Sequence, residues 1–234
     1  MKILGVIPCR YNSSRFPGKS LLVIGGKSMV QRVFEQAQKS TLDQIIVATD
    51  DERIYNNVLS FGGNVIMTSS EHSNGSDRCF EALQKMEENF DGVINVQGDE
   101  PFIHPEQIQK IAHCLQQKNT QIATLGKAVF KKNKILDVNS PKVFFNEQMY
   151  ATAFKREVDF DENTQYYHHI GIYGYTSKAL ANITQLYPTK NEIEKHLEQL
   201  RWLENGYNIR VEITEHESFS IDTPEDVKKI AHLL

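Results

Sequence analysis

The first half of the chain alternates short apolar runs with amphipathic stretches. The apolar runs predict strands at residues 3–7, 45–49, 64–67 and 92–96. The amphipathic stretches between them predict helices at residues 29–38, 52–61, 76–88 and 105–117. Strands that alternate with helices in this way are typical of an α/β fold, a mostly parallel central sheet with helices on both faces. Ligands of such sheets bind at the carboxyl ends of the strands, where polar loops follow every predicted strand here.

Beyond Gln121 the pattern changes to extended segments rich in aromatic and β-branched residues. They predict strands at residues 122–130, 142–145 and 170–175, joined by polar connections. We interpret residues 122–190 as a smaller extended sub-lobe within a single domain of 234 residues. This sub-lobe would pair with itself or cover the site.

The last part of the chain returns to helical and strand patterns. An amphipathic helix is predicted over residues 192–205, with one apolar face formed by Ile193, Leu197, Leu200 and Leu203. A final strand is predicted at residues 211–214. Thr223 and Pro224 predict the N-cap and first turn of a closing helix.

Composition and charge exclude several classes of protein. A formal net charge of −4 gives no reason to expect binding to nucleic acid. Since no apolar run approaches the roughly 20 residues that cross a bilayer, we expect no membrane insertion. The short apolar start ends at Pro8, which argues against a signal peptide. Cys9, Cys79 and Cys114 are scattered without metal-ligand spacing, which favours a reduced, cytoplasmic setting.

The segment over residues 3–22 carries the densest candidate chemistry. Its predicted strand runs into a loop broken by proline and glycine, and this loop contains Arg10, Arg15 and Lys19. Because such breaks prevent regular structure, backbone amides in the loop are free to face a ligand. Three cations and free amides at the carboxyl end of a strand favour a polyphosphate site. The alternative is an ordinary basic surface loop.

Two aspartates are candidate ligands for a divalent cation. Asp99 follows a buried strand within the run Gly-Asp-Glu-Pro. Mg²⁺ prefers one or two carboxylates and completes its coordination with water and phosphate oxygens. Capping of the following helix is the alternative role for Asp99. Asp222 is the candidate second ligand, because Glu225 and Asp226 are already explained as first-turn acids of the closing helix.

Other polar segments leave two interpretations open. The run over residues 69–78 is dense in small polar groups, which suits hydrogen bonding to a nucleobase or an ordinary solvated loop. His168 and His169 point to opposite faces of a strand and cannot chelate one metal together, so we expect one of them to face the site. Glu198 and Gln199 would ordinarily lie on a solvated helix face. No Ser-His-Asp, Cys-His or zinc-type arrangement stands out, so we expect a site that binds, orients and neutralises.

Seven segments of the sequence resemble, in order, the motifs of the 3-deoxy-manno-octulosonate cytidylyltransferases, also called CMP-Kdo synthetases. They are RYNSSRFPGK, VATDDERI, MTSSEHSNGSDR, NVQGDEP, HIGIYGY, LEQLRWLENG and DTPED. Each segment alone is a weak signal, but the combination over residues 10–226 is specific. Two departures are Ser20, where the family commonly has proline, and a shorter region over residues 155–167 that lacks a proline-tryptophan element.

The resemblance implies a fold of the nucleotide-diphospho-sugar transferase type and a homodimer made through the later extended segments. It also implies the reaction of CTP with Kdo, an acidic eight-carbon sugar, to give CMP-Kdo and pyrophosphate with Mg²⁺ as cofactor. CMP-Kdo would serve lipopolysaccharide synthesis. The nearest alternative acceptors are 8-amino-Kdo and a sialic-acid-like nonulosonate. A glycosyltransferase and a noncatalytic nucleotide-binding module are the alternatives from other classes.

The matching motif positions imply roles for individual residues. The implied catalytic residues are Arg10, Lys19 and Asp99. The implied nucleotide-binding residues are Arg10, Ser13, Lys19, Ser73, Gly75, Asp77 and Arg78. The implied magnesium ligands are Asp99 and Asp222. The implied sugar-binding residues are Arg15, Gln97, Arg156, His169, Tyr173, Glu198 and Gln199, so the resemblance moves the last two from a solvated face to the substrate.

Overall fold

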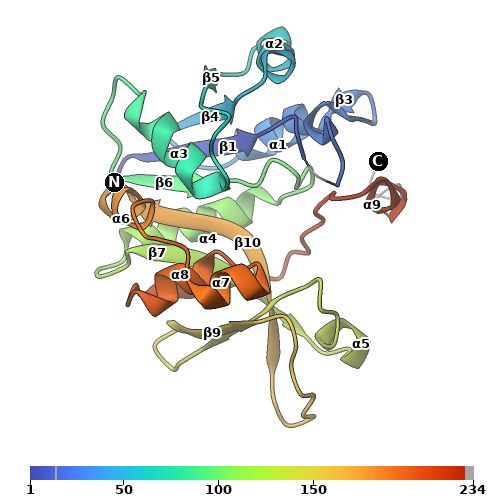
Figure 1. The fold of residues 1–234 in the computed structure, drawn as a ribbon, viewed down its shortest axis with the longest axis vertical. Coiled ribbons are helices and arrows are strands. Elements are labelled where there is room, and N and C mark those ends of the chain that lie inside the picture. Colours follow the sequence, from blue (N-terminus) through green and yellow to red (C-terminus); the bar gives the residue numbers. More distant parts are fainter. Residues whose placement is uncertain (14, 230–234) are drawn as a thin grey trace.

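A central sheet organises the fold in the computed structural model, which describes residues 1–13 and 15–229 (Figure 1). Seven strands of the described residues lie in the order β11-β7-β10-β6-β1-β4-β5, and the β8–β9 hairpin pairs onto β10. The strands are β1 (Ile3–Cys9), β4 (Gln44–Thr49), β5 (Val65–Met67), β6 (Gly92–Asn95), β7 (Ile122–Val129), β8 (Lys142–Phe145), β9 (Ala151–Lys155), β10 (Tyr166–Thr176) and β11 (Ile209–Ile213). A small separate hairpin is formed by β2 (Val23–Ile24) and β3 (Lys27–Ser28).

Most neighbouring strands in the central path are parallel, and only the long strand β10 runs antiparallel to its neighbours β6 and β7. The helices are α1 (Met29–Ala37), α2 (Glu52–Ser60), α3 (Gly75–Gln84), α4 (Pro105–Gln116), α5 (Lys132–Ile135), α6 (Ser177–Ile183), α7 (Lys190–Lys195), α8 (Gln199–Glu204) and α9 (Pro224–Lys229), with a 3₁₀ turn η1 (Lys19–Leu21). The predicted α/β fold with a mostly parallel sheet is confirmed.

Two apolar cores form because successive residues of a strand point to opposite faces of the sheet. Ile3 and Ile7 of β1 pack with the apolar faces of α1, α2 and α4. Leu4 and Val6 pack on the other face with α3, α6 and α8. Helices therefore cover both sides of β1, and the buried strand can end in polar loops without exposing its apolar body.

The segment over residues 122–190 is divided between two places. β7 and β10 run through the central sheet, whereas β8, β9 and α5 extend beyond it (Figure 1). β9, α5 and α6 lie within this segment although the sequence pattern did not predict them. The smaller extended part of the fold is therefore the β8–β9 hairpin with its connections.

The single helix predicted over residues 192–205 is wrong. The chain forms α7 and α8 instead, separated at His196, whose backbone is left-handed with φ of 51°. Arg201 is buried and its guanidinium lies 2.8 Å from Glu192 Oε1, so the two helices fold against each other. Ile193 is consequently 60% exposed, and it does not share a buried face with Leu197.

The predicted N-cap at Thr223 takes a different form. The Thr223 hydroxyl and backbone amide both donate to the Asp226 carboxylate, and the Asp226 amide donates to the Thr223 carbonyl. The side chain of Asp226, in the first turn of α9, is therefore the main acceptor at the start of this helix. Ile221 and Val227 fix this end of the chain against Ile24 and Met29 in a small apolar cluster.

Candidate active site

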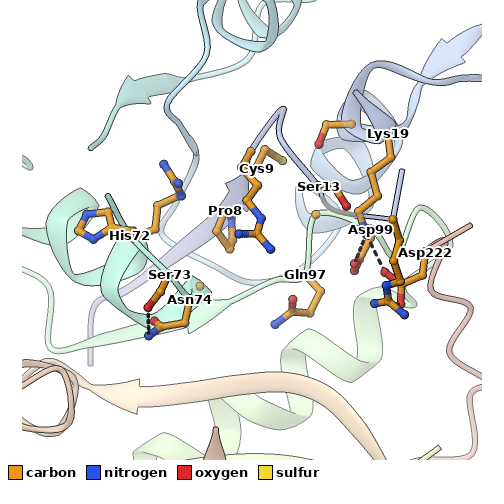
Figure 2. Close-up of a pocket in the computed structure, with 16 residues that line it drawn as sticks. Pro8, Cys9, Ser13, Lys19, His72, Ser73, Asn74, Gln97, Asp99 and Asp222 are labelled. Atoms are coloured by element: carbon orange, nitrogen blue, oxygen red, sulfur yellow. Dashed lines mark hydrogen bonds and ion pairs between the residues drawn. The ribbon is translucent and has the colours of Figure 1, made fainter. Parts of the chain in front are cut away.

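The loops that follow β1, β5 and β6 meet at one pocket of about 240 Å³, as predicted for the carboxyl ends of parallel strands (Figure 2). The pocket is lined by Pro8, Cys9, Arg10, Ser13, Arg15, Lys19, Ser20, His72, Ser73, Asn74, Gly75, Arg78, Gln97, Gly98, Asp99 and Asp222. Segments that are distant in the sequence thus contribute cations, small polar groups and two carboxylates to the same cavity.

Gly98 allows the β6 loop to approach the end of β1 closely. A Cβ atom at this position would lie 2.7 Å from both the Pro8 carbonyl oxygen and Cys9 Sγ, well inside contact distance. Only glycine therefore fits without a shift of the backbone. The close approach places Asp99 beside the basic loop.

Lys19 stands between two carboxylates at the centre of this arrangement. Its Nζ lies 2.7 Å from Asp99 Oδ2 and 2.9 Å from Asp222 Oδ1, and it also donates to the Ile221 carbonyl at 3.1 Å (Figure 2). Burial alone would lower the pKa of Lys19. The charges and hydrogen bonds of Asp99 and Asp222 outweigh burial and raise its pKa, so the ammonium stays charged.

Arg15 extends the ion pairs toward solvent. Its guanidinium lies 3.0 Å from Asp222 Oδ2, and its side chain is 65% exposed. Asp222 therefore faces two cations of the basic loop, Arg15 and Lys19. An exposed arginine at the mouth of a pocket is free to exchange this partner for an anionic ligand.

Hydrogen bonds from Arg78 hold the loop after β5 where it meets the pocket. Arg78 is buried, and its guanidinium donates to Asp50 at 2.9 Å, to Thr68 Oγ1 at 2.6 Å and to the Ser69 carbonyl at 3.2 Å. Arg78 thus lines the pocket mainly as an anchor of the loop. Asn74 caps α3, because its Oδ1 accepts a hydrogen bond from the Asp77 backbone amide at 2.8 Å.

Asp77 does not line the main pocket, and its carboxylate accepts a hydrogen bond from Asn74 Nδ2 at 2.9 Å. His72 and Asn74 line the main pocket although neither was singled out from the sequence. The only available signal was their place within the polar run over residues 69–78.

A second cavity adjoins the first, and Ser73 and Asn74 line both. It also contains the carboxylates of Asp77, Glu192 and Glu198 and the guanidinium of Arg201. Burial raises the pKa of Glu198 to about 7 even though the charge of Arg201 opposes the change. A carboxyl group with a pKa near neutral therefore lines the second cavity, next to the cation-rich main pocket.

Three buried polar atoms of α8 have no hydrogen-bond partner among the described residues, and of their residues only Arg201 lines the second cavity. They are Gln199 Nε2, Arg201 Nε and Trp202 Nε1. Buried polar groups are nearly always paired, so an unpaired set on one helix indicates where an additional polar molecule would bind.

Six of the seven predicted sugar-binding residues fall into three groups. Arg15 and Gln97 line the main pocket, and Glu198 lines the second cavity. Tyr173 and Gln199 are buried, and His169 is partly buried beside Tyr173. His169 Nε2 lies 3.0 Å from Thr124 Oγ1, and burial lowers its pKa to about 3, while the Tyr173 ring packs edge-on against Trp202. Their predicted contacts with a sugar stay predictions.

Arg156 lies outside both pockets. Its guanidinium donates to the backbone carbonyls of Lys195, Val138 and His196 at 2.9, 3.2 and 3.1 Å. These contacts fix the break between α7 and α8 onto the β8–β9 hairpin. The arrangement gives Arg156 a structural task in addition to the predicted contact with the sugar.

A further group of metal-binding residue types lies elsewhere among the described residues, at His104, Glu106 and His216. Their polar atoms already bond to one another: His216 Nε2 lies 2.9 Å from Glu106 Oε2, and the Glu106 amide donates to His104 Nδ1. The two imidazole rings stack with centroids 3.6 Å apart. In-plane nitrogen lone pairs of stacked rings do not converge on one ion. We therefore interpret this group as a cap at the start of α4, where His104 is the N-cap residue.

The sheet, the basic loop and the paired carboxylates define a nucleotidyltransferase. The family model for cytidylyltransferases matches residues 4–231, so the chain belongs to the cytidylyltransferase family.

Relatives named 3-deoxy-manno-octulosonate cytidylyltransferase are similar along nearly the whole chain. The one from Parabacteroides distasonis is 50% identical, with 98% of this chain and 96% of the relative covered. The mitochondrial one from Arabidopsis thaliana is 42% identical and covers 100% of this chain and 83% of the relative. A solved structure of CMP:2-keto-3-deoxy-manno-octonic acid synthetase complexed with CTP is 37% identical, with a TM-score of 0.93 and coverage of 100% and 98%.

Proposed function

We propose that this chain joins CTP and 3-deoxy-manno-octulosonate to give CMP-Kdo and pyrophosphate. The observation that carries the proposal is the meeting of the basic loop with Asp99 and Asp222 in one pocket, where Lys19 contacts both acids. The relatives with this name, and the similar structure that holds CTP, support the choice of nucleotide and sugar.

The chain's own residues would carry most of the reaction by positioning and neutralisation. The anomeric hydroxyl of the sugar attacks the α-phosphorus of CTP and loses its proton to water as the new phosphorus–oxygen bond forms. Pyrophosphate leaves with the electron pair of the broken phosphorus–oxygen bond. Arg10 and Lys19 line the same pocket and would neutralise the triphosphate. Ser13, Ser73 and Gly75 offer small polar or backbone groups around the same pocket.

The donor set fits a magnesium ion. Asp99 and Asp222 point their carboxylate oxygens at one cation, the Lys19 ammonium, and two carboxylates are the protein ligands that Mg²⁺ prefers. Magnesium held by these two residues would supply positive charge to the phosphate oxygens as charge develops on the leaving group.

The acidic sugar would occupy the second cavity beside the main pocket. Its hydroxyl groups would pair with Glu198 and with the unpaired buried Gln199 Nε2, and Arg15 and Gln97 would meet it at the boundary with the nucleotide. A sugar acid brought next to a triphosphate needs cations at the point of contact, and Arg15, which lines the main pocket, would supply one.

Pyrophosphate release is the direct test of this function. Purified enzyme should release pyrophosphate from CTP with Kdo, and much more slowly from UTP with Kdo. A panel with 8-amino-Kdo and a sialic acid would identify the preferred sugar. Tight CTP binding without turnover of any sugar acid would contradict the proposal, and a preference for another acid would replace Kdo as the acceptor.

We also infer a homodimer from the exposed apolar side chains of the extended part. Phe130 is 79% exposed, Leu136 and Val138 are exposed a few residues further along the chain, and Phe160 is exposed in the connection between β9 and β10. Such residues mark protein interaction surfaces when they gather. Phe130→Asp should lower the molar mass measured by light scattering by about half.

The structure contains no helix long and apolar enough to span a membrane among its described residues. A cytoplasmic location and a role in lipopolysaccharide synthesis stay predictions.

A further inference from the structure

Asp222 lies on a connection without regular structure. Residues 214–222, which we call the strap, join β11 to α9 and contain neither helix nor strand. Figure 1 shows this segment crossing in an extended path from the sheet to α9. The position of the Asp222 carboxylate therefore depends on the contacts that hold the strap.

A hydrogen bond from Ser218 ties the middle of the strap to the loop of Asp99. Ser218 Oγ donates to Glu100 Oε2 at 2.5 Å, and Glu100 is only 4% exposed. Three residues further along, the Ile221 amide donates to the Asp99 carbonyl at 2.9 Å. The two bonds fasten the residues just before Asp222 to Asp99 and its neighbour.

The side-chain pair of His216 and Glu106, near the start of the strap, is a weaker tie than the Ser218–Glu100 bond. His216 Nε2 lies 2.9 Å from Glu106 Oε2, and these side chains are 31% and 51% exposed. Exposed ion pairs contribute little because water and salt screen them. A buried acid that loses its donor keeps an unsatisfied oxygen, which costs far more. The Ser218–Glu100 bond is thus the tie with the greater effect on the strap.

We propose that Glu100 and Ser218 are positioning residues that set the separation of the Asp99 and Asp222 carboxylates. Neither residue lines the main pocket, so they act through the two acids and not on the substrate. The inference rests on the proposed function, in which the two acids hold a divalent cation. It adds a reason for the buried glutamate of the Gly-Asp-Glu-Pro run, which neither metal binding nor substrate contact explains.

The order of the strap can be measured without metal or substrate. In metal-free protein, hydrogen exchange of a peptide containing the Ile221 amide should be slow in the wild type and at least about tenfold faster in Ser218→Ala, because the strap opens locally. Ser218→Thr keeps the hydroxyl, and Glu100→Gln keeps an acceptor oxygen. Both variants should exchange at nearly the wild-type rate.

Cation binding provides the second measurement. Mn²⁺, which takes the same carboxylate ligands as Mg²⁺, can be titrated by electron paramagnetic resonance in the presence of CTP. Ser218→Ala should weaken Mn²⁺ binding by about fivefold to tenfold, the effect of losing one buried hydrogen bond. His216→Ala removes the exposed tie on the same strap and serves as the matched control, with a change below about twofold.

The outcomes separate this inference from the proposed function. Unchanged exchange and unchanged Mn²⁺ affinity in Ser218→Ala would overturn the positioning role, even in an enzyme that makes CMP-Kdo. If His216→Ala changed exchange and Mn²⁺ affinity as much as Ser218→Ala does, the positioning role would also be overturned. The loss of any side-chain contact of the strap would then have the same effect. Failure of the proposed function would show instead as a wild type that releases no pyrophosphate. Circular dichroism melting would confirm that Ser218→Ala is folded, and a misfolded variant would be replaced by Glu100→Leu.

Discussion

The ammonium of Lys19 lies 2.7 Å from the carboxylate of Asp99, although 80 residues separate them in the chain. The contact joins the loop after β1 to the loop after β6, which are neighbouring parallel strands. A second bond from Lys19 to Asp222 adds a third segment of the chain. One cation therefore holds together the parts of the site that would bind phosphate and metal.

Replacement of Lys19 by methionine should lower turnover sharply. The side chain keeps similar length and apolar contacts, but the charge that would neutralise the triphosphate is lost. We expect kcat for pyrophosphate release to fall by about 100-fold or more, as for loss of a group that stabilises transition-state charge. The far-ultraviolet circular dichroism should be unchanged. Lys27→Met, which removes an exposed lysine paired with Glu35, is the matched control. Near-normal kcat in Lys19→Met would refute the role.

Removal of the divalent cation should abolish activity reversibly. A chelator should stop pyrophosphate release, and added Mg²⁺ or Mn²⁺ should restore it, because both ions take carboxylate ligands. Asp222→Asn should raise the Mg²⁺ concentration for half-maximal rate by about tenfold or more, since one charged ligand is lost. Glu225→Gln, in the first turn of α9, should leave this concentration unchanged. Full activity of the wild type in excess chelator would contradict the metal site.

Much of this site was predictable because strand ends determine where loops meet. The apolar run at residues 3–7 and the Gly-Asp-Glu-Pro run after residue 96 are local patterns, and parallel neighbours bring their ends together. The motifs then pointed to Lys19, Asp99 and Asp222, which the fold brings into contact.

The break between α7 and α8 was not predictable in the same way. Apolar residues continue at helical spacing through residues 192–205, so the pattern indicates one helix. The break depends on burial of Arg201 against Glu192 and on the three carbonyls that Arg156 binds. Such long-range contacts leave no periodic signal. The same holds for the Ser218–Glu100 bond.

Glu198 should make stability depend on pH in a defined direction. Burial raises its pKa in the folded state to about 7, above the ordinary value of 4.5. The folded protein therefore holds more protons than the unfolded chain between these values, so the free energy of unfolding falls as pH rises from about 4.5 to 7. A shift of this size corresponds to about 3 kcal/mol.

Urea denaturation at pH 5 and pH 7.5 measures this effect. Glu198→Gln should remove most of the difference between the two conditions, because glutamine does not titrate. Glu194→Gln, on the exposed side of α7, is the control and should keep the wild-type difference. An unaltered difference in Glu198→Gln would show that other groups cause the pH dependence.

Substitution of Gly98 by alanine tests the close approach that places Asp99. The added Cβ would lie 2.7 Å from the Pro8 carbonyl, so the β6 loop must move away from β1. We expect a loss of about 1–3 kcal/mol in the free energy of unfolding, the usual result of overpacking, and a weaker Mn²⁺ site. Gly171→Ala is the matched control, because its Cβ would meet only Gln97 at 3.9 Å. If Gly98→Ala matched the control in stability and Mn²⁺ affinity, the close approach would not be what positions Asp99.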